Sequence, residues 1–245
     1  MSGIPRTTTT TKQPVYESIY LAMKSDIVEC RLLPNERLRL EDLKQKYGAA
    51  FTSLREALSR LISEGLVVME QHRGARVADM MDDDFLDLLH VRRIIEAEAM
   101  RSAVINGDDE WESAIVAAFH MYERALGQSR QGQASAHRIQ RHNDFHNALV
   151  SACISKRTLS LRTMLYVQAE RYLMLSFKSP APPPDSILQE HENIMRAALA
   201  RKVDLSVALI QEHLDGAAQR VMPIGTTLER MSRARLTNRD NPKAE

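Results

Sequence analysis

Four histidines have the residue type and the spacing that bind a metal ion. His142 and His146 are four residues apart, so both imidazoles would lie on one side of a helix. His191 and His213 each share the face of a later helical segment with apolar residues. Three helices would therefore direct histidines into a bundle, and nitrogen ligands favour Zn, Ni, Cu or Fe over Mg or Ca.

Other interpretations of histidines in this chain are simpler. A single histidine on an apolar face is more often an ordinary core or surface residue than a ligand. Four histidines outside the group keep that ordinary role: His72, His90, His120 and His137. A zinc protease is excluded, because Asn143 follows His142 and the H-E-x-x-H motif with its general base is absent.

Two arginines have the chemistry to bind a carboxylate effector. Arg92 lies one helical turn before Glu96, and Arg171 precedes Tyr172 on an otherwise apolar segment. A planar guanidinium can form a bidentate pair with a carboxylate, so we expect Arg92 and Arg171 to bind the effector. The alternatives are a salt bridge from Arg92 to Glu96 and an Arg171 side chain that extends along the bundle to reach water.

A group of polar residues near the N-terminus has the chemistry of DNA recognition. Thr52, Ser53 and Arg55 would begin a helix whose apolar residues face a core, which leaves Arg55 accessible. Arginine is the side chain best matched to guanine O6 and N7 in the major groove. Arg73 and Gly74 would form the tip of a hairpin that contacts the DNA backbone or minor groove.

The elements that would position the DNA-contacting residues are three short helices and a hairpin. Apolar spacing and turn residues predict the helices 15–30, 41–47 and 52–63 and the strands 66–69 and 75–77. Thr52 or Ser53 would cap the third helix. This order is that of a winged helix-turn-helix. A protein-interaction module is the alternative, because the segment 12–80 holds 11 Lys and Arg against 10 Asp and Glu.

The chain after Met80 is helical, without a convincing strand. The predicted helices are 83–106, 109–128, 134–154, 156–178, 187–201 and 203–220, the last capped by Asp204. The expected fold class is mainly α, with a winged helix-turn-helix followed by an all-helical bundle. The predicted division is a disordered tail (1–14), the DNA-binding domain (15–80), the effector, metal-binding and dimerisation domain (83–225) and a polar tail (226–245).

Composition limits the remaining possibilities. A net charge of +1 over 245 residues excludes DNA binding through a globally basic body, so any nucleic-acid surface must be a local patch. Cys30 and Cys153 are too few for a disulfide framework. No segment has the length of a membrane span, and the first residues lack the apolar core of a signal peptide. We therefore expect a cytoplasmic protein that does not bind membranes.

The residues from Leu54 to Val67, LREALSRLISEGLV, resemble the recognition-helix signature of GntR-family transcriptional regulators. The segment LPNERL, 33–38, resembles the turn of that family, and RGARV, 73–77, resembles its wing. The resemblance implies that Thr52, Ser53, Arg55 and Gly74 contact operator DNA. Two departures concern the turn glycine, which is Asn35 here, and the usual Ser-Arg pair, which is Ala50-Phe51.

A GntR-type head before an all-helical domain resembles the FadR subfamily with its FCD effector domain of six to seven helices. The resemblance implies that His142, His146, His191 and His213 bind a divalent transition metal, Zn or alternatively Ni, although the aspartate of the family's D-x3-H motif is His142 here. The R-x3-E pattern of the family supports Arg92. Residues 108–111 and 141–142 resemble a carbon-starvation-induced branch that represses glutarate and 4-aminobutyrate catabolism, which implies a short dicarboxylate effector such as glutarate or 2-hydroxyglutarate.

These observations predict a repressor that binds a palindromic operator as a homodimer and is released by a small carboxylate. A dimer is expected because one short recognition helix reads too few base pairs. Two alternatives stay open. One is a metal-dependent enzyme, although the chain has no G-x-S-x-G motif and no P-loop. The other is a metal-free bundle that serves only dimerisation.

Overall fold

The computed structural model describes residues 15–71, 73–128, 136–177 and 184–222, together with 224, 225 and 228. The predicted tails at 1–14 and 226–245 lie outside the described residues, except for 228. The chain divides into two compact units, residues 1–79 and 80–245.

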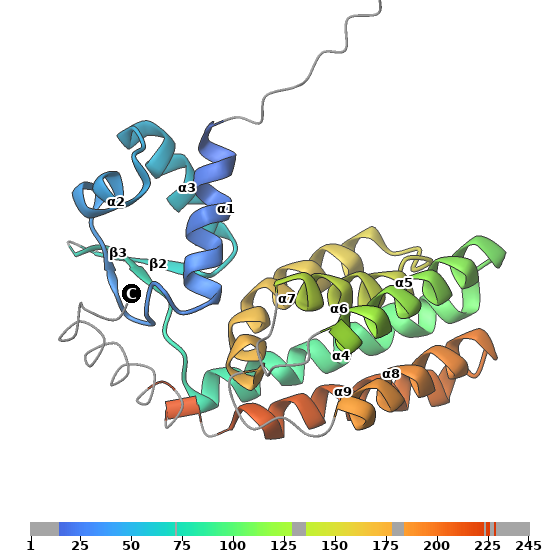
Figure 1. Cartoon of the computed structure of the whole chain (residues 1–245). Coiled ribbons are helices and arrows are strands. Elements are labelled where there is room, and N and C mark those ends of the chain that lie inside the picture. The colour runs from blue at the N-terminus through green and yellow to red at the C-terminus, as the bar shows by residue number, and fades with distance from the viewer. Residues whose placement is uncertain are drawn as a thin grey trace, which may run out of the picture. The chain divides into compact units, whose positions relative to one another are not determined.

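The first unit has three helices and a small sheet (Figure 1). Its elements are α1 (Val15–Val28), β1 (Arg37–Leu38), α2 (Leu40–Tyr47), α3 (Phe51–Ser63), β2 (Val67–Glu70) and β3 (Gly74–Val77). The sheet is antiparallel in the order β1-β3-β2, with Leu38 opposite Ala75 and Glu70 opposite Gly74. The hairpin was expected, whereas β1 was not, because two residues are too few to show the alternation of a strand.

The core of this unit forms between α1 and α3. Met23 and Ile27 on α1 and Leu54 and Leu61 on α3 are fully buried. Their spacings of four and seven residues place each pair on one side of its helix. The opposite side of α3 stays exposed at Arg55, so the packing that buries the apolar residues also presents the arginine.

Two backbone details of this unit concern residues discussed in the sequence analysis: the start of α3 and Asn35. The prediction that Thr52 or Ser53 caps α3 is wrong: the cap position is Ala50, without a side-chain cap. The amide of Leu54 donates to the carbonyl of Ala50 at 3.1 Å, so the helix has already begun at Phe51. Asn35 has φ 64°, a left-handed conformation that asparagine tolerates better than most residues, which explains why it replaces glycine here.

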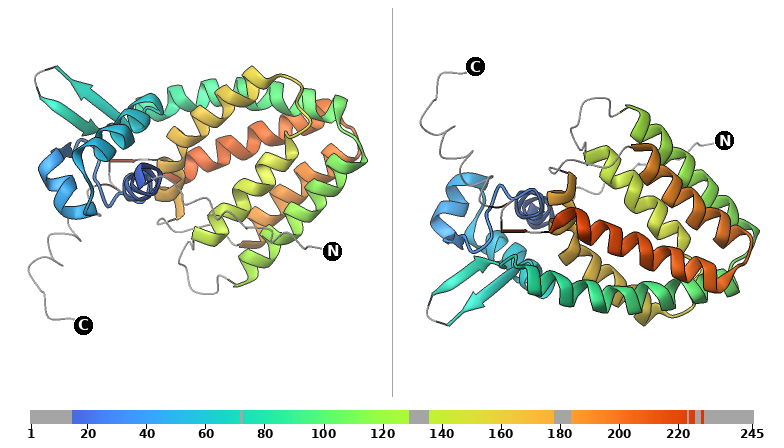
Figure 2. Two further views of the ribbon diagram at one scale, coloured as in Figure 1. Left: turned by 90° about the horizontal axis from the view of Figure 1, so that it is seen from above. Right: turned by 90° about the horizontal axis from the view of Figure 1, so that it is seen from below.

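Within the described residues, the second unit has six helices and no strand. They are α4 (Asp82–Asn106), α5 (Asp109–Gln128), α6 (Ala136–Leu149), α7 (Lys156–Phe177), α8 (Pro184–Leu199) and α9 (Val203–Val221). Figure 2 shows α4 running beside α9, with α7 across α4 and with α5, α6 and α8 completing the bundle. This arrangement matches the predicted mainly helical fold class.

The bundle core is apolar, and it includes Trp111 near the turn between α4 and α5. Met100, Ile115, Phe145, Leu149 and Ile194 are among its fully buried side chains. A Cβ on Gly107 would lie 2.1 Å from Cε3 of Trp111, so only glycine permits the close approach of the indole ring at this turn.

Two helix ends differ from the prediction. Helix α6 ends at Leu149, so Cys153 is not on it as expected. Asp204 is not the cap of α9, because the helix starts at Val203 after Lys202. Arg201, in a left-handed conformation with φ 55°, sets this turn, and Asp204 instead accepts a hydrogen bond from Arg101 at 3.1 Å.

Candidate functional site

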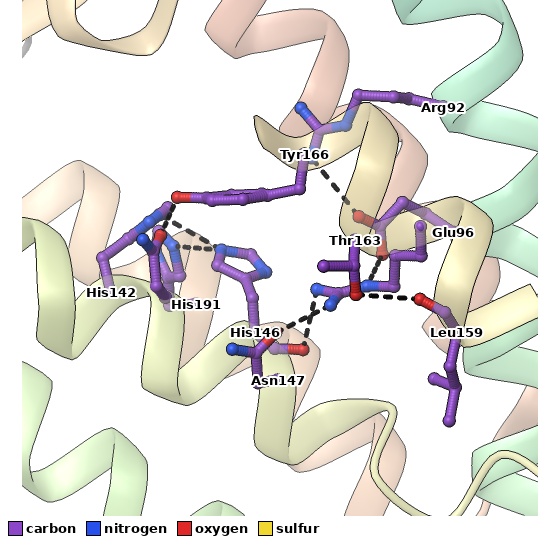
Figure 3. Close-up of polar contacts among 11 residues, drawn as sticks. Arg92, Glu96, His142, His146, Asn147, Leu159, Thr163, Tyr166 and His191 are labelled. Atoms are coloured by element: carbon purple, nitrogen blue, oxygen red, sulfur yellow. Dashed lines mark hydrogen bonds and ion pairs between the residues drawn. The ribbon is translucent and has the colours of Figure 1, made fainter. Parts of the chain in front are cut away.

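The structure brings the four predicted metal-binding histidines together. His142 and His146 come from α6, His191 from α8 and His213 from α9, and one nitrogen atom of each lies within 4.8 Å of the others. The Nε2 atom of His146 is 3.1 Å from Nε2 of His142 and 3.2 Å from Nε2 of His191 (Figure 3). His142 is half-buried and the other three are buried.

Two of the nitrogen separations in this histidine cluster match those of neighbouring ligands on one metal ion, while the whole set lies within 4.8 Å. Zinc–nitrogen bonds are about 2.0–2.1 Å long, which puts adjacent ligand atoms about 2.9–3.4 Å apart for angles from octahedral to tetrahedral. The observed separations of 3.1 and 3.2 Å fall inside this range. Among the described residues, no other group of three or more His, Cys, Asp or Glu side chains brings its ligand atoms this close together.

Neighbouring oxygen atoms orient two of the rings. The Nδ1 atom of His191 lies 2.6 Å from the carbonyl oxygen of Ile187, and Nδ1 of His213 lies 3.2 Å from Oε2 of Glu190. Each oxygen accepts a hydrogen bond from a protonated Nδ1, which leaves the lone pair on Nε2. The Nε2 atom of each ring is therefore available to a metal.

Burial lowers the pKa of three of the histidines, His142, His146 and His191. Desolvation, followed by the electrostatic coupling to His213, lowers the pKa of His142 to about 3. Burial first, and then the neighbouring histidines, lowers the pKa of His146 and of His191 well below the ordinary value of 6.5. These three imidazoles are neutral near pH 7, which is the protonation state that binds a metal.

Arg92 lies beside the cluster on α4. It is buried, and its Nη2 atom donates to Oε1 of Glu96 at 3.3 Å, the salt bridge that the sequence predicted as an alternative. The guanidinium also lies 5.6 Å from the ring centroid of Tyr166, whose hydroxyl donates to Asn143 beside His142. Its Nε atom has no hydrogen-bond partner among the described residues. Arg92 therefore keeps a free donor close to the cluster.

Sequence reasoning missed Arg162, which connects Arg92 with the cluster. From α7, its Nε atom donates to Oε2 of Glu96 at 2.7 Å. Its Nη1 atom donates to Oδ1 of Asn147 at 2.7 Å, and Nη2 donates to the carbonyl of His146 at 3.1 Å (Figure 3). One buried arginine thus joins α4, α6 and α7 at the site.

Arg171, the second predicted effector ligand, is not brought to this site. It lies nine positions after Arg162 on α7, and at 100° per residue it extends from the opposite side of the helix. Its neighbour Tyr172 donates to Asp84 at 2.7 Å and stacks on Phe85 at the start of α4. Arg171 is therefore buried in another part of the bundle.

Two further arginines lie near the histidine cluster, and no motif in the sequence predicts their position. Arg138 on α6 lowers the pKa of His142, after the larger effects of burial and His213. Arg220 on α9 contributes in the same direction to the pKa of His191. Together with Arg92 and Arg162 they outnumber Glu96 and Glu190, the carboxylates beside the same histidines, and this excess of positive charge favours an anionic ligand.

Three of the predicted DNA contacts, Arg55, Arg73 and Gly74, line one groove of the first unit, whereas Thr52 and Ser53 lie on α3 outside its lining. Thr52 and Arg55 on α3 are exposed, Ser53 is half-buried, and Arg73 with Gly74 forms the turn of the β2–β3 hairpin. A groove of about 560 Å³ runs between α3 and the hairpin. Its charged lining comprises Arg37, Arg39, Glu41, Arg55 and Arg73. Arg37 and Arg39 were not predicted, because they precede α2 and belong to no recognised DNA-contact pattern.

Two family models match this chain, one within each of its two compact units. The model described as bacterial regulatory proteins, gntR family, matches residues 15–77, and the FCD domain model matches residues 87–216.

Two relatives match over most of their length. The chain is 36% identical to the uncharacterized HTH-type transcriptional regulator BphR of Paraburkholderia xenovorans, over 85% of this chain and 86% of the relative. It is 30% identical to the HTH-type transcriptional repressor GlaR of Escherichia coli, over 80% of this chain and 90% of the relative.

Solved structures share the fold. The E. coli protein McbR/YncC aligns with a TM-score of 0.69 at 15% identity, covering 90% of this chain and all (100%) of that one. A GntR regulator from Rhodococcus sp. RHA1, described from its crystal structure, aligns with a TM-score of 0.66 at 20% identity, covering 84% of this chain and 97% of that one.

Among the described residues, no helix is both long enough and apolar enough to cross a membrane.

Proposed function

Since the chain belongs to the GntR family of bacterial regulatory proteins and carries an FCD domain, we propose that it represses transcription until a small carboxylate binds in its helical bundle. Its relatives are regulators of transcription, and several are repressors. The chain is therefore a DNA-binding regulator and not an enzyme. The dimer, the operator and the effector are the parts that we propose.

Two copies of the DNA-binding unit would read a palindromic operator. Arg55 would pair with a guanine, Thr52 and Ser53 would contact DNA beside it, and Arg73 with Gly74 would contact the backbone. The arginines that line the groove, Arg37 and Arg39, would add phosphate contacts. This surface is a local basic patch on a chain of net charge +1. The affinity for DNA would therefore depend on these few side chains.

The histidine cluster would hold one divalent transition metal, and its geometry carries the proposal. The ligands would be the Nε2 atoms of His146, His191 and His213, with His142 as the fourth. An all-nitrogen set favours Zn, with Ni as the alternative. When bound, the ion supplies a Lewis acid for a carboxylate oxygen.

Arg92 would bind the effector beside the metal. Its 3.3 Å contact with Glu96 is long for a charged hydrogen bond, and its Nε atom has no partner among the described residues. An arriving carboxylate can therefore use donors that Glu96 leaves free. The surrounding positive charge favours a dianion, and the resemblance described above makes glutarate and 2-hydroxyglutarate the first candidates. Arg171 is not part of this proposal.

The test is metal analysis of the purified protein, followed by a thermal-shift screen of C4–C6 dicarboxylates with and without added Zn or Ni. We expect one metal per chain and a melting temperature raised by metal and again by one dicarboxylate, because both bind the folded state. His146→Ala should lose the metal, whereas His120→Ala, at an exposed histidine paired with Glu123, should keep it. A wild-type bundle that never takes up metal would favour the alternative of a metal-free dimerisation domain.

A further inference from the structure

The recognition helix begins with an exposed aromatic residue. Phe51 is the first residue of α3 and keeps 36% of its surface accessible. Its neighbours Ala50 and Thr52 are also exposed, and no side chain caps the helix. The end of α3 that enters the major groove in this fold therefore presents a methyl group, a phenyl ring and a threonine.

The phenyl ring lies against a cation from the preceding helix. Lys44 on α2 has its Nζ atom 4.9 Å from the centroid of the Phe51 ring, which is within the range of a cation–π contact. In helix-turn-helix proteins the helix before the recognition helix crosses the DNA backbone. Lys44 thus favours this placement of the ring at the start of α3, and in the helix-turn-helix docking its ammonium group would lie near a phosphate.

We propose that Phe51 reads thymine through its 5-methyl group. Phe51 offers no hydrogen-bond donor, and the thymine methyl is the apolar group on the major-groove edge of the bases. Contact with it would remove both apolar surfaces from water. Cytosine has a hydrogen at C5 and an amino group in place of thymine O4, so the ring would discriminate between the two pyrimidines. This inference rests on the proposed use of α3 as the recognition helix.

The position of the thymine follows from Arg55. Phe51 and Arg55 are one helical turn apart on α3, which corresponds to about 6 Å along the helix axis. Since base pairs follow one another at about 3.4 Å, the thymine should lie within about two base pairs of the guanine read by Arg55. Each operator half-site would then contain a thymine and a guanine at a fixed short distance.

The test uses full-length protein and a duplex selected by it from random DNA. Each thymine of the duplex is replaced in turn by deoxyuridine, which removes the methyl group and keeps the base pair, and affinity is measured by fluorescence anisotropy. We expect one symmetry-related thymine per half-site at which uracil weakens binding about three- to tenfold. Phe51→Ala should bind the two duplexes equally, and Phe51→Leu should retain part of the difference.

Two variants separate base reading from a structural role. Phe51→Arg restores a bidentate donor and should shift the selected base at this position from thymine to guanine. If uracil is neutral at every position of the wild-type duplex, or if Phe51→Ala keeps the wild-type ratio and only lowers the melting temperature, the inference is wrong. Failure to select any sequence would instead overturn the proposed role of α3.

Discussion

Glu96 on α4 accepts a hydrogen bond from Arg162 on α7 at 2.7 Å, and both side chains are only 5% exposed. The same guanidinium donates to the backbone carbonyl of His146. Glu96 also accepts from Arg92, the proposed effector ligand. The carboxylate therefore joins the helix that would sense the effector to the helix that carries two of the histidines.

Glu96→Gln should lower the free energy of unfolding of the bundle by about 3 kcal/mol. The substitution leaves two buried guanidinium groups, on Arg92 and Arg162, without a compensating carboxylate, and the loss of one partner of a buried ion pair is strongly destabilising. Urea unfolding followed by circular dichroism measures the effect.

The matched control for this ion pair is Glu192→Gln. Glu192 accepts from Arg196 at 2.6 Å, but that arginine side chain is 71% exposed, so the change should stay below about 1 kcal/mol. Replacing Glu96 and Arg162 together by leucine and methionine should cost less than the sum of the single changes. Equal effects of Glu96→Gln and Glu192→Gln would contradict the buried role of Glu96.

Glu190→Gln should lower metal affinity roughly 10- to 100-fold. Its carboxylate lies 3.2 Å from Nδ1 of His213 and fixes the tautomer that presents Nε2. Titration with Zn against a competing chelator measures the affinity. Glu123→Gln, which removes the carboxylate 3.7 Å from the exposed His120, is the control and should leave the affinity unchanged. A Glu190 variant with wild-type affinity would show that this hydrogen bond does not orient a ligand.

The sequence predicted the histidine site better than the arginine site, and the reason is physical. The spacing of His142 and His146 is local, and apolar neighbours show the side on which each of His191 and His213 is buried. Arg162 has no such signal, because its partner Glu96 is 66 positions away. The apolar neighbours of Arg171 indicate that it is buried, but a buried helix is apolar on several sides, so these neighbours do not show which side faces the ligand.

Most of the fold can be predicted from the sequence, because the apolar period of a helix and the residues of a turn are local features. What sequence reasoning missed depends on tertiary contacts. Strand β1 exists through its pairing with β3, and its two residues form no pattern alone. The start of α3 at Phe51 depends on the backbone at Ala50 and not on the hydroxyl residues that follow.

Acid should destabilise the metal-free bundle below pH 6.5. The pKa of His146 and of His191 is lowered in the folded protein, so the unfolded chain binds more protons as the pH falls. The stability that these neutral histidines contribute is present above their unfolded pKa of about 6.5 and is lost below it. The slope should reach about 1.4 kcal/mol per pH unit for each histidine, measured by urea unfolding at pH 7.5, 6.5, 5.5 and 4.5.

Substitution of Arg55 and of Arg39 should affect DNA binding in different ways. Arg55→Ala should lose about 1–3 kcal/mol of discrimination at one base pair, because a bidentate base contact disappears. Arg39→Ala should weaken all sequences alike and reduce the slope of log affinity against log salt by about 1, because a phosphate contact disappears. Anisotropy with selected and scrambled duplexes at several salt concentrations distinguishes the two. An Arg55 variant with unchanged sequence preference would contradict its assignment.

Arg92→Lys should weaken the effector response about tenfold and leave DNA affinity unchanged. Lysine keeps the charge near the histidines but loses the planar donors, among them the Nε atom that has no partner within the described residues. Arg93→Lys is the matched control, because the adjacent arginine donates to Asp215 at 2.6 and 2.7 Å and is thereby already paired. Calorimetric titration with glutarate, 2-hydroxyglutarate and succinate, together with release of bound DNA, measures both properties. If no dicarboxylate binds the wild-type protein below about millimolar concentration, or if Arg92→Lys and Arg93→Lys respond alike, Arg92 does not bind the effector.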